Sequence, residues 1–201
     1  MNIEEVRGQI TRTFIDWSSF LRNLQVVRKG NSITWSGRET RMLEDQVLAS
    51  DVIKLSDDEQ YTFQVATDGS VFQIYYQYDK KGNTLQSARL AFYSAQGDSP
   101  VGWLRIDYEP ALAKGILHHD CHMHLSAFPQ ARCVVAGVPN PQQFVEFVMA
   151  VCYPETYEAH RLGQDGEYAN PNKASEVNSR CFSAVEHLAY KQIIHLRIPT
   201  S

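Results

Sequence analysis

Four of the seven histidines of this chain lie in the stretch ILHHDCHMHLSAF, residues 116–128. His122 and His124 are two positions apart, so on a β-strand their imidazoles would share one face. Histidine has an unperturbed pKa of about 6.5, so two of them can act as general acid and general base near neutral pH. We therefore regard this pair as the main candidate for chemistry, whereas His118 and His119 are predicted to lie in a loop.

The preceding segment LRIDYE, residues 104–109, carries groups that complement a histidine pair. An aspartate such as Asp107 orients an adjacent imidazole, and an arginine such as Arg105 can bind a phosphate with its guanidinium fork. If the two segments are neighbouring strands, residues opposite each other share a face. The polar groups then meet only when an odd position opposes an even one, for example Asp107 opposite His122 or His124, because a slip of one residue would put the histidines behind the sheet.

The leading interpretation is metal-independent cleavage of phosphodiester bonds, as in a ribonuclease-type toxin. Its catalytic residues would be Arg105, Asp107, His122 and His124, its substrate RNA or DNA, and it would require no cofactor. The formal net charge of -4 and the pI near 6.0 argue against a broad polyanion-binding surface, so this activity would depend on a local basic patch.

A metal site is a further interpretation of the same residues. A His-x-His pair on a strand directs two imidazoles toward one point, and Asp107, Glu109 or His118 would supply a third ligand for a divalent metal. The leading interpretation does not need this ion, so the cofactor is left open.

A non-catalytic role is the runner-up hypothesis. The domain would then be the protein-binding subunit of a defence or toxin–antitoxin type assembly, with a partner protein encoded nearby. Tyr75, Tyr93 and Trp103 are predicted to lie on the outer face of the sheet, where an aromatic patch would suit a partner.

The elements that position these residues are predicted from periodicity. Apolar residues at steps of three and four predict a helix over residues 3–26, and short turns between alternating segments predict an antiparallel meander of five or six strands over residues 60–138. Helices follow over residues 140–192, starting with Asn140 as N-cap. The predicted fold is a single α+β domain, residues 1–201, with the terminal helices packed on one face of the sheet.

No two of the four cysteines have the C-x-x-C spacing, which argues against a zinc site formed by four thiolates. No signal peptide and no apolar run of about 20 residues is evident, so we expect a cytoplasmic protein with reduced thiols and no membrane span. Cys121 shares strand parity with Met123 and Leu125, which predicts that its thiol is buried on the apolar face.

Three stretches of the chain resemble the bacterial domain-of-unknown-function family 2290. They are DGSVFQIYYQYD…ARLAFY at 68–93, LRIDYEP at 104–110 with HMHLSAF downstream, and PNPQQFVEFVMAVCYPE at 139–155, and the resemblance covers roughly residues 60–160. It implies a bacterial origin and a fold rather than a reaction, since the family has no settled activity, and it suggests an association with mobile or defence-type genes.

Overall fold

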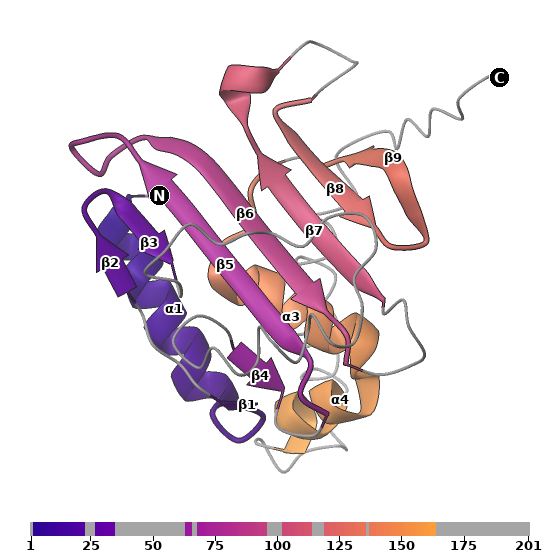
Figure 1. Ribbon diagram of the computed structural model, residues 1–201. Coiled ribbons are helices and arrows are strands. Elements are labelled where there is room, and N and C mark those ends of the chain that lie inside the picture. The colour runs from indigo at the N-terminus through magenta and orange to yellow at the C-terminus, as the bar shows by residue number, and fades with distance from the viewer. Residues whose placement is uncertain are drawn as a thin grey trace, which may run out of the picture.

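The computed structural model describes residues 2–22, 27–34, 63–65, 68–95, 102–113, 119–135 and 137–163. These residues form an α+β fold in which helices pack on one face of an antiparallel sheet (Figure 1). The elements are, in chain order, α1 (Ile3–Trp17), β1 (Leu21–Arg22), β2 (Val27–Lys29), β3 (Ser32–Thr34), β4 (Phe63–Val65), β5 (Val71–Tyr78), β6 (Leu85–Tyr93), β7 (Trp103–Tyr108), the 3-10 helix η1 (Pro110–Leu112), β8 (Cys121–Leu125), β9 (Phe128–Val134), α3 (Pro141–Cys152) and α4 (Pro154–Gly163).

The strands from β4 to β9 pair in chain order and form the predicted meander of six strands. The short strands β1, β2 and β3 join the same sheet, β1 beside β4 and β3 beside β5, so the sheet extends beyond the predicted range of residues 60–138. Every pair described is antiparallel.

One face of the sheet forms the core with the helices. The even-numbered side chains of β5, β6 and β7 are buried in a single cluster with residues of α1, α3 and α4, as the two-residue alternation predicted. From the sheet these are Phe72, Ile74, Tyr76, Tyr78, Ala88, Leu90, Phe92, Leu104 and Ile106. Leu85 also packs against the core, because the β5–β6 register shifts between Gln77 and Tyr78. The other odd-numbered side chains of these strands must point away from the helices, which defines the outer face of the sheet.

The first helix is shorter than the sequence predicted. It begins with a capping box of Asn2 and Glu5 and ends at Trp17, whereas the apolar periodicity predicted a helix to residue 26. The chain turns after Trp17, and residues 21–22 and 27–29 instead pair with other strands. Tertiary pairing thus overrides a helical pattern that continues past the turn.

The helix after the sheet begins as predicted. Asn140 accepts a hydrogen bond from the backbone N–H of Gln143, and Pro141 occupies the first turn of α3. The buried stripe of α3 ends before Val151, which is 58% exposed. The part of the predicted helical range 140–192 that follows residue 163 lies outside the described residues.

Candidate functional site

The register between β7 and β8 brings the predicted polar residues together. Arg105 lies opposite His124, and Asp107 lies opposite His122, so odd positions oppose even ones as the site requires. Both pairs lie on the outer face, because Ile106 of β7 and Cys121 of β8 belong to the core. The pairing thus meets the condition under which the acidic and basic groups of β7 and the two histidines of β8 share one face.

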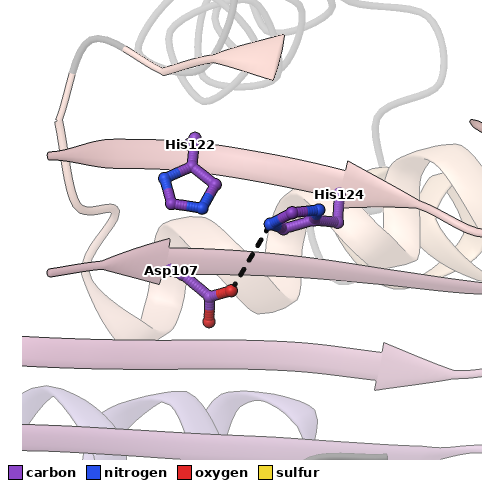
Figure 2. A group of neighbouring side chains, drawn as sticks. All are labelled: Asp107, His122 and His124. Carbon is purple, nitrogen blue, oxygen red and sulfur yellow. Dashed lines mark ion pairs between the residues drawn. The ribbon is translucent and has the colours of Figure 1, made fainter. Parts of the chain in front are cut away.

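Asp107, His122 and His124 form a compact and buried group, which we call the Asp–His–His cluster. Their exposed fractions are 5%, 2% and 8%, and one potential ligand atom from each lies within 4.8 Å of the others. Figure 2 shows the three side chains on the same side of β7 and β8, with the ring of His124 directed toward the carboxylate. The imidazole centroids are 4.8 Å apart, with the rings inclined at 74°.

The backbone fixes the tautomer of His122. Its Nδ1 lies 3.0 Å from the carbonyl oxygen of His119, which can only accept a hydrogen bond. Nδ1 must therefore carry the proton and donate it to this carbonyl, which leaves the lone pair of a neutral imidazole on Nε2. Metal-binding histidines commonly have this arrangement, with one ring nitrogen held by a backbone carbonyl and the other available to the ion.

His124 is close to Asp107 without a normal hydrogen bond between them. Its Nε2 lies 3.6 Å from Oδ2 of Asp107, which allows an ion pair when the imidazole is protonated (Figure 2). A hydrogen bond between these atom types is about 2.7–3.2 Å long. The pair is therefore looser than an aspartate–histidine pair in which the carboxylate holds the ring by a hydrogen bond.

Two arginines flank the carboxylate of Asp107. Arg105 donates from Nε to Oδ2 of Asp107 at 2.8 Å, and Nε of Arg89 lies 3.8 Å from Oδ1. Arg89 also forms an ion pair with Glu109. Partial burial opposes the charge of Arg89, but the hydrogen bond and the charges of Glu109 and Asp107 outweigh it and raise the pKa of its guanidinium. These contacts place two cations beside the Asp–His–His cluster.

Arg89 was not predicted as a site residue, although the sequence contains a signal for it. It alternates with Ala88 and Leu90, which are buried in the core, so it must point to the outer face. Only the register between β6 and β7 shows that it lies directly opposite Asp107.

The remaining candidates lie outside the cluster. Glu109 pairs with Arg89, His119 lies 2.7 Å from Asp120 through its Nδ1, and His118 lies outside the described residues. Cys121 is buried in the core as predicted, and burial followed by the nearby carboxylates raises the pKa of its thiol to about 12. A thiol with so high a pKa is a poor nucleophile at neutral pH.

The predicted exposed aromatic patch is wrong. Tyr93 and Trp103 do have the parity of the outer face, but they are buried, with exposed fractions of 0% and 5%, and Tyr75 is partly buried. An accessible aromatic surface formed by these three residues is therefore not present.

The fold and the site define an α+β protein with an Asp–His–His cluster and flanking arginines on the outer face of an antiparallel meander. Residues 96–198, more than half of the 201 residues, match the model of a family described as "Uncharacterized conserved protein (DUF2290)". The chain belongs to this family, as its resemblance predicted, and the match lies further toward the C-terminus than the stretches that carried the resemblance. No curated protein and no solved structure matches the chain significantly.

Proposed function

We propose that this protein hydrolyses phosphodiester bonds and that Asp107, His122 and His124 hold a divalent cation for the reaction. The observation that carries the proposal is the convergence of three buried ligand atoms within 4.8 Å, on two strands that the register holds side by side. Two imidazoles and one carboxylate form a common ligand set of catalytic zinc and related metal sites.

The ligand atoms are positioned for a cation but are not yet at coordination distance. Two atoms that each bind one ion at about 2.1 Å lie at most about 4.2 Å apart, so the cluster must contract by small side-chain rotations. The 3.6 Å separation between His124 and Asp107 favours this role over an acid–base dyad, because the two groups approach without a normal hydrogen bond.

The arginines supply the substrate-binding part of the proposal. Arg105 contacts Asp107 through Nε, which is not part of the fork formed by its two terminal nitrogens, and its side chain is 18% exposed. A guanidinium fork in this position suits a phosphate, and Arg89 adds a second positive charge on the same face. A divalent cation bound in the cluster would lower the pKa of a water molecule and polarise the phosphoryl group.

Metal-independent acid–base cleavage is the second candidate, and the tautomer of His122 suits it as well as it suits metal binding. Nε2 of His122 has the lone pair that a general base needs, and His124 beside Asp107 is suited to be the protonated acid. This mechanism uses the same residues but needs no ion, so removal of metal separates the two candidates.

The biological setting is part of the proposal. We place the activity in the bacterial cytoplasm, in a defence- or toxin-associated role, with RNA or DNA as the substrate. Cys121, Cys133 and Cys152 are free thiols, which suits a reducing compartment. No helix within the described ranges is long and apolar enough to cross a membrane. The alternative of a non-catalytic subunit that binds a neighbouring protein loses its main support, because Tyr93 and Trp103 are buried.

The test combines metal analysis with nuclease assays. Protein purified without a histidine tag is assayed on single-stranded RNA and DNA, with chelator and with added Zn²⁺, Mn²⁺ or Mg²⁺. We expect about one equivalent of bound metal and activity that the chelator abolishes, both lost in His122→Ala and His124→Ala. His119→Ala is the matched control, because its partly exposed ring pairs with Asp120 and the variant keeps the backbone carbonyl that holds His122.

Activity that survives complete metal removal but requires both histidines would favour the acid–base candidate instead. Background-level turnover by the wild-type protein and both variants, with and without metal, would reject the hydrolase proposal.

A further inference from the structure

The two oxygens of the Asp107 carboxylate have different surroundings. Oδ2 accepts the 2.8 Å hydrogen bond from Nε of Arg105 and lies 3.6 Å from Nε2 of His124. Oδ1 is buried and has no hydrogen-bond partner among the described residues. Figure 2 shows one oxygen directed toward His124 and the other directed away from both histidines. A buried carboxylate oxygen with unused lone pairs calls for an explanation.

The guanidinium of Arg89 contacts two carboxylates unequally. Its Nη2 is 2.5 Å from Oε1 of Glu109, whereas its Nε is 3.8 Å from Oδ1 of Asp107. The first contact is a charge-assisted hydrogen bond, and the second is too long for a hydrogen bond. Burial lowers the pKa of Arg89, and the hydrogen bond and charge of Glu109 raise it more than the charge of Asp107 does. Glu109 is therefore the stronger partner of Arg89.

Arg89 is nevertheless within reach of the unbonded oxygen. The register holds Arg89 directly opposite Asp107, and side chains of directly opposite residues can meet on one face of a sheet. A guanidinium that donated a hydrogen bond to Oδ1 would leave both oxygens of Asp107 bonded to arginines, because Arg105 already bonds Oδ2. Such a carboxylate would have lost the charge and the lone pairs that a cation needs. The ion pair with Glu109 opposes this movement.

From these contacts we infer that Glu109 is a positioning residue for the proposed metal site, which holds Arg89 away from Asp107 and so keeps the carboxylate able to bind a cation. Residues that orient the groups around a metal ligand commonly change metal affinity by about 10–100-fold when they are replaced. The inference rests on the proposed function for the presence of the cation, and it adds the pair of residues that regulates its affinity.

The test is a double-mutant cycle in the affinity for Zn²⁺. Isothermal titration calorimetry on metal-free protein without a histidine tag compares the wild type, Glu109→Gln, Arg89→Met and the double variant. We expect Glu109→Gln to weaken Zn²⁺ binding about tenfold or more, because the released guanidinium then competes with the ion. In the Arg89→Met protein, the same Glu109→Gln change should weaken binding by less than about threefold, because no guanidinium remains to compete.

Asp120→Asn is the matched control for the loss of one negative charge. The backbone N–H of Glu109 donates to the carbonyl of Asp120, so the two residues are neighbours across the β7–β8 ladder. The carboxylate of Asp120 pairs with His119 and is 45% exposed, so its replacement should weaken Zn²⁺ binding by less than about threefold. Urea unfolding verifies that each variant is folded during the titration, and Arg89→Gln replaces Arg89→Met in the cycle if the latter is not.

The movement of Arg89 is measured without metal by NMR, through the exchange of arginine Nε–H protons with water. In the wild type we expect slow exchange for Arg105, whose Nε donates to Asp107, and fast exchange for Arg89. Glu109→Gln should slow the exchange for Arg89 as well, because its Nε–H then donates to Oδ1 of Asp107. Fast exchange for Arg89 in this variant would overturn the inference. Equal weakening of Zn²⁺ binding by Glu109→Gln with and without Arg89, or by Asp120→Asn, would also overturn it.

Nuclease assays on the same preparations separate the two proposals. The expected cycle in a protein that cleaves neither RNA nor DNA would reject the hydrolase and support the role of Glu109. Metal-dependent cleavage with equal Zn²⁺ affinities for the wild type and Glu109→Gln would reject the role of Glu109 alone. A wild-type protein that binds no metal would reject both the metal-dependent hydrolase and this inference.

Discussion

Asp107 lies directly opposite His122 in the β7–β8 ladder, and the same carboxylate approaches His124 diagonally, with Oδ2 3.6 Å from Nε2. One acidic residue thus lies beside both histidines of a His-x-His pair, because direct and diagonal neighbours on one face of a sheet are both within reach of side chains. Two cations, Arg89 and Arg105, contact the same carboxylate, so they lie beside this group of three possible ligands.

Asp107→Asn tests the carboxylate as a ligand. The amide removes the negative charge that a cation requires, so we expect bound metal to be lost and any nuclease activity to fall by at least about 100-fold. The free energy of unfolding should fall by about 1–3 kcal/mol, because Arg105 and Arg89 lose their ionised partner. Metal analysis, the nuclease assay and urea unfolding measure the three effects. Normal metal content in this variant would contradict the assignment of Asp107 as a ligand.

Arg105→Lys tests the phosphate-binding role. Lysine keeps the charge but not the planar fork, so we expect KM for RNA to rise about tenfold while the bound metal remains. Arg132→Lys is a matched control, because Arg132 is exposed on β9 and is not in the cluster. Kinetics over a range of RNA concentrations separate KM from kcat, and equal KM values for the wild type and Arg105→Lys would argue against the contact.

The stability of the helical layer should depend on pH through His160. Its ring is buried against Trp17, with a centroid separation of 4.1 Å, and faces the carboxylate of Asp16 and the charges of Arg161 and Glu146. Burial, followed by the charge of Arg161, lowers the pKa of the imidazole below 6.5, although Asp16 and Glu146 oppose this shift.

The direction of the pH effect follows from this lowered pKa. Below about pH 6.5, His160 is protonated more readily in the unfolded chain than in the folded one. The contribution of His160 to the free energy of unfolding is therefore complete above this pH, and it is lost as the pH falls through the lowered pKa of the folded state. Urea unfolding at pH 7.5, 6.5 and 5.5 should show the decline in the wild type and a smaller one in His160→Phe. Identical pH profiles for the two proteins would show that another group controls the stability in this range.

Gly82 should be the least replaceable of three glycines with a positive φ. Gly30, Gly69 and Gly82 have φ values of 62°, 79° and 74°, a region that costs other residues about 1–2 kcal/mol. At Gly82, an added Cβ would also lie 2.7 Å from Cγ2 of Ile3, whereas at the other two nothing lies within 4 Å. Gly82→Ala should therefore destabilise the protein more than Gly30→Ala or Gly69→Ala in urea unfolding. Equal losses for all three would indicate that the Ile3 side chain moves aside without cost.

Patterns of short range predicted much of this fold. Alternation assigned Phe72, Ile74 and Tyr76 to the core and their odd-numbered neighbours to the outer face. Local capping chemistry at Asn140 and Pro141 set the start of α3. These predictions succeeded because strand parity and helix capping depend on a few neighbouring residues.

Features that depend on contacts between distant parts of the chain were predicted less well. The periodicity of the first helix continues past Trp17, yet pairing with β4 takes residues 21–22 into the sheet. Parity assigned Trp103 and Tyr93 to the outer face correctly, but parity contains no information on whether that face is covered, and both residues are buried.

For the site, the sequence determined that His122 and His124 share a face and that Arg105 and Asp107 share another. Whether the two faces coincide depended on a single register choice, which the loop between β7 and β8 leaves open because its length does not fix the pairing. The tertiary structure determines that register, and it also places Arg89 of the preceding strand opposite Asp107. The position of Arg89 relative to the cluster follows from backbone hydrogen bonding across the sheet, which no spacing along the sequence encodes.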